Sequence, residues 1–157
     1  MARASRRLAL VVSALLAIVV MAGCAKRATQ KPVETSTAMA GAYQVDYGKS
    51  KLYDHDDMDA AIQVIMGEFG TWKGCTMQDI VFTSDDVCTA DVSYCNELRD
   101  EGTPEFDEAI VFKSDFHSPS GQDAEGTAWE PDTDYAGWEW HLARTGNGTW
   151  QLLTWGY

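Results

Sequence analysis

Few side chains in this sequence have the type and spacing that a reaction requires, and the best pair is a carboxylate beside a histidine. Glu139 and His141 are two residues apart in a segment that alternates like a strand, so both point to one face of it. A carboxylate that orients a histidine can support general acid–base chemistry when both groups converge in an enclosed cavity. An enzyme that uses this pair in the concavity of a sheet is therefore an alternative, beside the simpler interpretation of a solvated outer face.

The other candidate sites lack a required residue. His117 stands next to Ser118, but no G-x-S-x-G elbow supports a serine nucleophile. The acidic run at 54–59 has Met58, and later Ile65, where a calcium-binding EF-hand loop places oxygen ligands. No two of the three histidines stand at metal-ligand spacing. We therefore predict no catalytic constellation, no metal site and no cofactor.

The N-terminal residues have the features of an export signal. Three arginines and no acid precede an apolar run from Leu8 to Gly23, a pattern typical of a secretory signal peptide. The run is 16 residues long, short of the roughly 20 residues that a membrane-spanning helix needs. The pair Arg6-Arg7 also resembles the start of a twin-arginine signal, and the strongly apolar run favours the general secretory route.

The end of the apolar run resembles a lipobox, because Ala22 and Gly23 precede Cys24. In a lipobox the cysteine is acylated and becomes the new N-terminus, and two or three acyl chains hold a protein stably on a membrane. We therefore predict a signal peptide at residues 1–23 and a lipid anchor at Cys24, on the outer face of a bacterial cell membrane. Residues 24–50 are predicted to be the lipidated cysteine and a flexible, polar tether, and a single domain occupies residues 51–157.

The charge distribution excludes nucleic acid as a partner. Removal of the signal peptide changes the formal charge from −12 to −15, because three arginines and no acids are lost. Basic residues at 26–31 can lie near anionic lipid headgroups. From residue 34 onward there are 24 acids against six lysines and arginines, so the domain is repelled from nucleic acid, which requires basic patches. We interpret the acidic charge as a feature that keeps an exported domain soluble.

Apolar spacing predicts one long N-terminal helix followed by strands. The segment 54–69 has a continuous apolar stripe, an aspartate that can cap it and a glycine after it. Strands are predicted at 78–83, 109–113, 137–144 and 150–157, with a short second helix at 89–99 and a polar loop at 117–133. The last two strands pair across Gly146-Asn147-Gly148. The predicted fold class is α+β, with the helix packed on a curved antiparallel sheet of about four strands.

Three cysteines remain besides the lipidated one, so at most one intramolecular disulfide can form. Cys88 and Cys95 are two helical turns apart, about 10 Å if both lie on one helix, which is too far for a bridge. The predicted second helix turns Val92, Cys95 and Leu98 inward. Cys75 is interpreted as a free buried thiol, and the pairing of the three stays open.

Several short motifs of the domain resemble those of a known family. They are Trp72-Lys73-Gly74-Cys75, Ile110-Val111-Phe112-Lys113-Ser114-Asp115-Phe116, Trp138-Glu139-Trp140-His141-Leu142-Ala143-Arg144 and Trp155-Gly156-Tyr157. In this order after a helix, they resemble a family of small bacterial lipoproteins of unknown function, with domains similar to the cone-shaped nuclear transport factor two-like and cystatin-like α+β folds. The resemblance covers about residues 50–157 and implies a fold and an extracytoplasmic address, without catalytic residues. One strong helix in place of three indicates a reduced, open version.

Aromatic residues crowd the last predicted hairpin. Five of them exceed what one helix can cover: Trp138, Trp140, Trp150, Trp155 and Tyr157. Strand alternation places Trp150 and Trp155 on opposite faces. Strand tryptophans usually fill the core, but exposed aromatic patches mark binding sites. We therefore expect a lipid-anchored, non-enzymatic binding module whose aromatic face meets a wall glycan, a small ligand or another envelope protein. A purely structural envelope protein is the remaining alternative.

Overall fold

The computed structural model describes residues 43–157, which form a five-stranded mixed sheet with two α-helices. The elements are β1 (Gln44–Asp46), α1 (His55–Phe69), β2 (Thr76–Phe82), α2 (Asp85–Leu98), β3 (Glu108–His117), the 3-10 helix η1 (Gly121–Ala124), β4 (Asp134–Arg144) and β5 (Gln151–Gly156). The predicted signal peptide, Cys24 and most of the predicted tether lie outside the described residues. The α+β class is confirmed.

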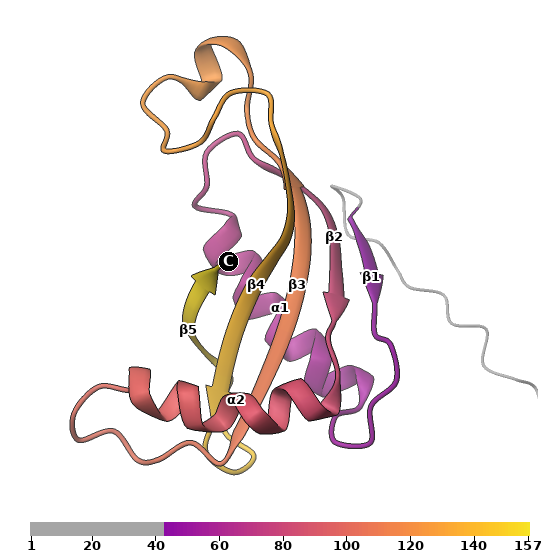
Figure 1. Ribbon diagram of the computed structural model, residues 1–157, viewed down its shortest axis with the longest axis vertical. Helices are drawn as coiled ribbons and strands as arrows, with labels where there is room; N and C mark the ends of the chain where they lie inside the picture. The colour runs from indigo at the N-terminus through magenta and orange to yellow at the C-terminus, as the bar shows by residue number, and fades with distance from the viewer. Residues whose placement is uncertain (1–42) are drawn as a thin grey trace, which may run out of the picture. The chain divides into compact units, whose positions relative to one another are not determined.

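The strands follow chain order across the sheet, from β1 at one edge to β5 at the other (Figure 1). β1 pairs parallel with β2, which requires a crossover that α1 supplies, and the other neighbours are antiparallel. The prediction of about four antiparallel strands is therefore wrong in detail. It also places residues 44–46 in the tether, because three residues carry too little apolar pattern to be recognised as a strand.

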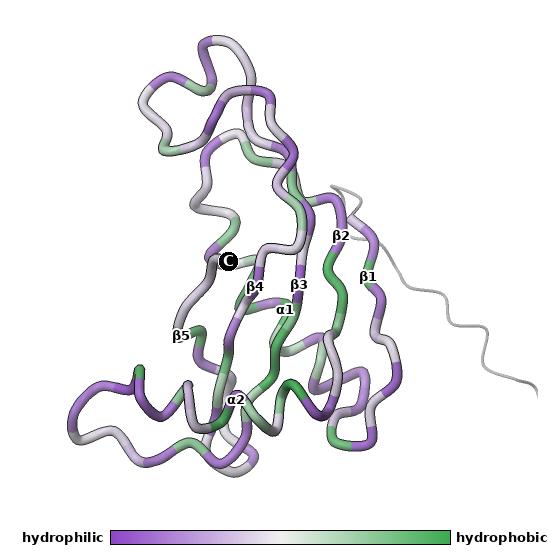
Figure 2. Tube along the Cα trace, viewed as in Figure 1, coloured by the Kyte–Doolittle hydropathy of each residue, from purple (hydrophilic) through white to green (hydrophobic). Residues whose placement is uncertain are grey.

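α1 packs on one face of the sheet and holds the main core. In Figure 1 it lies behind the strands, whereas α2 crosses in front of them. The buried stripe of α1 is the predicted one: Met58, Ala61, Ile62, Ile65 and Phe69. Asp54 accepts the Asp57 backbone N–H at 2.9 Å and so caps the helix. Figure 2 shows apolar residues along the central strands and polar residues in the connections, as this packing requires.

α2 is nearly as long as α1, rather than the short helix predicted at 89–99. It begins at Asp85 because Ser84 caps it, with the serine oxygen accepting the Val87 backbone N–H at 3.2 Å. The first turn is polar, so apolar periodicity alone starts the helix too late. Within residues 43–157, neither helix is long and apolar enough to cross a membrane.

The inward side of α2 carries Cys88 and Cys95, both fully buried. Cys75, Cys88 and Cys95 are all free thiols, and Cys75 is half-buried rather than buried. The expectation that two cysteines on one helix cannot bridge is confirmed. Leu98, predicted to point inward, is 41% exposed. Inward positions on a helix recur after three or four residues. Counted from Cys95, a spacing of three gives Leu98, which is exposed, and a spacing of four gives Arg99, which is half-buried.

β3 and β4 continue beyond their predicted ends because aspartate side chains bridge an irregularity in their pairing. The register shifts between Ser114 and Phe116. There Asp115 Oδ1 accepts the Gly137 backbone N–H at 2.7 Å, and Asp79 Oδ1 accepts the Asp115 N–H at 3.1 Å. Gly137 has a φ of 71°, which residues with a Cβ rarely adopt. The carboxylates replace the lost ladder contacts, and both strands run on past the bulge.

Arg144 ties α1 to the end of β4 where the last hairpin begins. Its side chain is 10% exposed, and it donates to Asp57 at 2.7 Å and Glu108 at 2.6 Å. The guanidinium also lies 4.2 Å from the ring centroid of Trp150. One buried cation therefore links four segments that are distant in sequence.

We predict that Arg144→Met lowers the free energy of unfolding by about 2–3 kcal/mol, because two carboxylates lose their cation. The value lies below that of a fully enclosed pair, since the Asp57 and Glu108 side chains are 30% and 35% exposed. Urea denaturation at neutral pH measures it. Lys113→Met is the matched control: Lys113 pairs with Glu139 at 3.0 Å but is 51% exposed, so its loss should cost less than about 1 kcal/mol. Equal losses would contradict the role given to Arg144.

Candidate functional site

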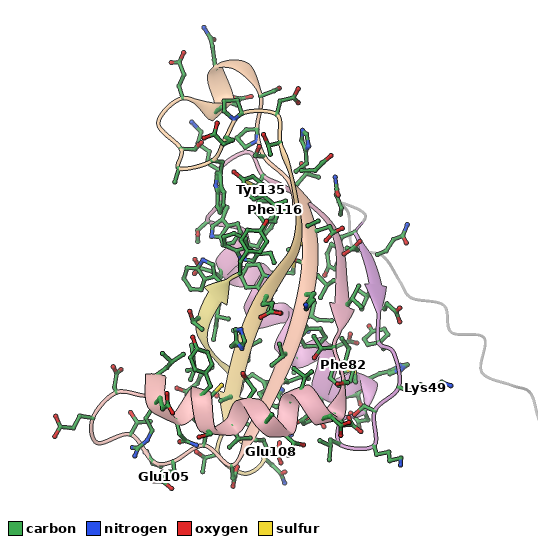
Figure 3. The ribbon with its side chains drawn as sticks, viewed as in Figure 1. Lys49, Phe82, Glu105, Glu108, Phe116 and Tyr135 are labelled. Atoms are coloured by element: carbon green, nitrogen blue, oxygen red, sulfur yellow. The ribbon has the colours of Figure 1, made fainter. Side chains whose placement is uncertain are left out.

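Aromatic rings from five segments gather around Trp72, which follows the end of α1. Its ring centroid lies 4.8–6.3 Å from those of Phe116, Trp129, Trp138, Trp140 and Trp155. Tyr135 stacks on Phe116, and Tyr157 meets Trp138 edge-on. We call these eight residues the aromatic cluster. Figure 3 labels Phe116 and Tyr135, which lie among the crowded rings beside the upper part of β4 in this view.

Two of the five residues predicted as a ligand surface are core residues. Trp140 is fully buried, and its Nε1–H donates to Ser114 Oγ at 2.8 Å. Trp150 is 5% exposed and lies outside the aromatic cluster, where its Nε1–H donates to the Asp57 carbonyl at 3.1 Å. Both indoles have found the polar partner that burial demands. Their assignment to an exposed surface is therefore corrected.

The exposed part of the aromatic cluster is the C-terminal end of β5. Trp155 is 41% exposed and Tyr157 is 82% exposed, with the half-buried Trp138 behind them. The prediction that Trp150 and Trp155 lie on opposite faces is wrong, because the register with β4 shifts by one residue at Leu153. This bulge returns both tryptophans to the α1 face. The candidate surface is therefore formed by Trp155 and Tyr157.

Sequence reasoning assigned two members of the aromatic cluster elsewhere. Trp72 follows the helix predicted at 54–69 and was not predicted as part of a ligand surface, whereas it packs against the core and is the centre of the cluster. Trp129 lies in the loop predicted as polar at 117–133, yet it packs 4.8 Å from Trp72. A single tryptophan in a polar loop was the available signal, since so large an apolar ring is seldom left in water.

One polar atom under the exposed rings lacks a partner. The Nε1–H of Trp138 is buried and makes no hydrogen bond with any of the described residues, and the Tyr157 ring lies 5.1 Å from that indole. A buried donor without an acceptor costs about 1–3 kcal/mol. The packing of the aromatic cluster must offset this cost.

The predicted polar pair does come together, on the other face of the sheet. His141 Nε2 lies 3.5 Å from Glu139, and Asp91 of α2 lies 3.0 Å from His141 Nδ1. The His141 side chain is only 14% exposed, so the expected solvated face is wrong for this residue. The pair lies beside α2 rather than in a concavity under α1, and each ring nitrogen already faces a carboxylate. This arrangement ties α2 to β4.

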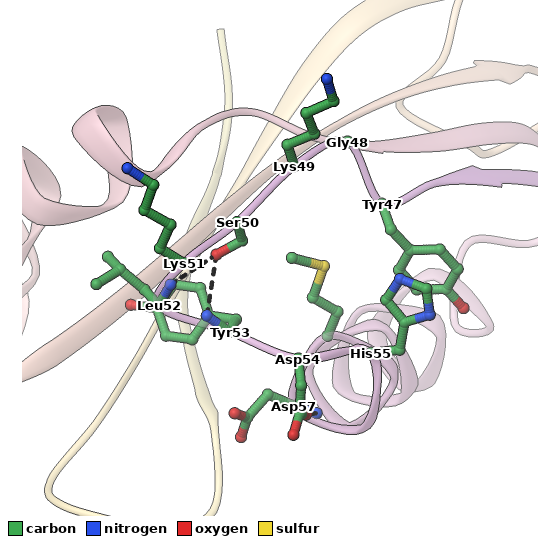
Figure 4. Close-up of a pocket in the computed structure, with 11 residues that line it drawn as sticks. Tyr47, Gly48, Lys49, Ser50, Lys51, Leu52, Tyr53, Asp54, His55 and Asp57 are labelled. Atoms are coloured by element: carbon green, nitrogen blue, oxygen red, sulfur yellow. Dashed lines mark hydrogen bonds between the residues drawn. The ribbon is translucent and has the colours of Figure 1, made fainter.

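Two pockets stand out among the described residues, and neither is lined by Glu139 or His141. One, of about 700 Å³, lies between residues 47–54 and the start of α1 (Figure 4). Its central polar group is Ser50, which accepts the backbone N–H groups of Leu52 at 3.0 Å and Tyr53 at 2.9 Å and donates to Asp85 at 2.5 Å. These groups hold the loop in place. The other, of about 440 Å³, lies between α1 and the turn before Trp150.

Comparison with known proteins found no significant match for this chain. No protein-family model matches it, and no curated protein or solved structure matches it significantly. Within residues 43–157, no group of three or more histidine, cysteine, aspartate or glutamate side chains is placed to hold a metal ion.

His141 makes the stability of the α2–β4 contact dependent on pH. The hydrogen bond with Asp91 raises the pKa of His141 above its ordinary value of 6.5, and burial opposes this. A raised pKa in the folded state gives stability that is fully present below the unfolded pKa and is lost as pH rises through the folded pKa.

We predict that Asp91→Asn reduces the loss of unfolding free energy between pH 6 and pH 8, because the imidazolium loses its main partner; the upper limit stays below the ordinary pKa of 9.0 of the Cys95 thiol, which also donates to Asp91. Urea denaturation across this range measures it. Asp86→Asn, an exposed acid in the first turn of α2, should keep the wild-type dependence, and His117 contributes equally in all three proteins. The same pH dependence in Asp91→Asn and wild type would contradict the assignment.

Proposed function

We propose that this chain is a lipid-anchored, extracytoplasmic lipoprotein whose domain is a non-enzymatic binding module for a neutral glycan of the cell wall. The observation that carries the proposal is the exposure of Trp155 and Tyr157 at the edge of an otherwise packed aromatic cluster. Sugar rings present apolar C–H faces that stack on such rings, and exposed aromatic patches with polar surroundings are typical of binding surfaces.

The packing beneath these rings supports a binding role. Trp155 stacks on the buried Trp140 with an interplanar angle of 29°, and Trp72 lies 6.3 Å from it. A side chain held in this way loses little conformational entropy when a ligand arrives.

The charge of the region supports a neutral ligand. From Thr145 to Tyr157 the sequence has no aspartate, glutamate, lysine, arginine or histidine. The rest of the domain is strongly acidic, and its field repels anionic partners. A neutral oligosaccharide is not repelled by this field and meets a segment without charged side chains.

The alternatives have less support. An enzyme based on Glu139 and His141 needs an enclosed site with a free imidazole nitrogen, whereas both nitrogens of His141 face carboxylates and the two pockets described above lie elsewhere. The likeness to small bacterial lipoproteins and cone-shaped α+β folds stays a proposal, supported by the packing of α1 on a sheet.

We predict that uncharged N-acetylglucosamine oligomers raise the melting temperature of residues 24–157 carrying Cys24→Ser, and that Trp155→Ala abolishes this shift. A ligand at about 100 times its dissociation constant stabilises a fold by about 2.7 kcal/mol. Tyr94→Ala is the matched control, because Tyr94 on α2 is 42% exposed, against 41% for Trp155. A flat response of the folded wild type would overturn the glycan proposal in favour of a protein partner.

We predict that cells expressing the full chain incorporate labelled palmitate into it, and that Cys24→Ser abolishes the labelling. Cys24 is the residue that follows the predicted cleavage site, so its thiol is the expected acceptor. Cys75→Ser, which removes a half-buried thiol of the domain, should leave the labelling intact. Labelling of Cys24→Ser at the wild-type level would contradict a lipid anchor at this residue.

A further inference from the structure

β5 is an unpaired edge of the sheet. Its only strand neighbour is β4. Apart from that ladder, no backbone–backbone hydrogen bond reaches Gln151–Tyr157 from any other described residue, and Figure 1 shows no element alongside the outer side of β5. Half of the N–H and C=O groups of such a strand point away from the sheet, where they can pair with another strand.

Of the usual protections of an edge strand, β5 has a single bulge and none of the others. Natural edges are protected by charged side chains, prolines, bulges or very short strands. β5 has six residues and one bulge, at Leu153, and the segment 145–157 contains no charged side chain and no proline. The opposite edge differs: β1 has three residues, one of them Asp46, and the described chain enters the sheet there.

The charge pattern indicates which strand fits this edge. With 24 acids against six lysines and arginines from residue 34 onward, two copies of the chain repel each other over most of their surfaces. The segment 145–157 has no charged side chain, so one copy can meet another there without acidic side chains facing each other. An antiparallel pair of identical strands is also self-complementary, and its two-fold symmetry closes after two copies.

We infer that β5 pairs antiparallel with β5 of a second copy, which joins two sheets edge to edge into one continuous sheet. Six residues per strand form a small contact, and interfaces below about 1,200 Å² are weak and transient. The dimer is therefore in equilibrium with the monomer rather than permanent. A two-fold axis perpendicular to the sheet keeps both α1 faces on one side, so the Trp155 side chains of the two copies lie on one surface.

Sedimentation velocity of residues 24–157 carrying Cys24→Ser, over about a hundredfold range of concentration, tests this inference. By mass action, the fraction of the chain in the dimer increases as the concentration rises. We expect the weight-average mass to rise toward twice that of the monomer. Thr154→Glu and Thr154→Arg each place like charges near the two-fold axis, so each variant alone should stay monomeric. Thr149→Glu, in the turn before β5, should dimerise like the wild type.

An equimolar mixture of Thr154→Glu and Thr154→Arg should regain the dimer, because opposite charges then meet across the strand pair. A variant that merely failed to fold could not be rescued in this way. A wild type that stays monomeric throughout, Thr154 variants that dimerise as the wild type does, or a mixture that stays monomeric would each overturn the inference. The inference does not rest on glycan binding. Trp155→Ala removes a side chain from the α1 face of β5 but leaves the backbone groups at its edge, so this variant should still dimerise.

Discussion

Burial of the Trp140 indole joins the parts of this domain that come from distant stretches of the chain. Trp140 is opposite Phe112 on β3 and Trp155 on β5 in the register of the sheet. It also stacks on Trp72 at 5.1 Å, which fixes the segment after α1. The ring is fully buried and its one donor reaches Ser114. Because large aromatic rings bury the most area per residue, this contact sets the positions of α1, three strands and the exposed Trp155 together.

A second constraint is the excess of acidic residues, several of which form hydrogen bonds that stabilise the fold. Asp54 caps α1, Asp79 and Asp115 bridge the bulge between β2, β3 and β4, and Asp91 holds His141. Each of these carboxylates accepts a hydrogen bond that the backbone or an imidazole would otherwise lack. Other acids pair with the few cations, as Asp57 and Glu108 do with Arg144, but acids far outnumber cations and the domain keeps a large negative charge. The uncharged segment 145–157 is therefore the part of the domain best suited to a contact with a neutral molecule.

Sequence patterns predicted the elements that bury one regular face. α1 was located within one residue, because its stripe and its cap agree, and the β4–β5 hairpin follows from its turn. β1 was missed because a three-residue parallel strand depends on its neighbour. Trp150 and Trp155 were predicted to lie on opposite faces of the sheet, and this is wrong because a bulge breaks the alternation of side chains. The bulge could not be predicted, because no pattern of side chains indicates it. Asp91 could not be paired with His141 from sequence, since the contact depends on how α2 crosses the sheet.

The two edges of the sheet differ in their distance from the start of the described chain. The described chain begins beside β1, and β5 is four strands away, or about 19 Å at about 4.8 Å per strand. A lipid anchor at Cys24 would pull on the β1 edge, where short length and Asp46 already oppose strand pairing. The β5 edge and Trp155 would then be the parts least hindered by the tether. The proposed anchor and the proposed aromatic surface would together fit one arrangement, in which the domain is held at one edge and makes its contacts at the other.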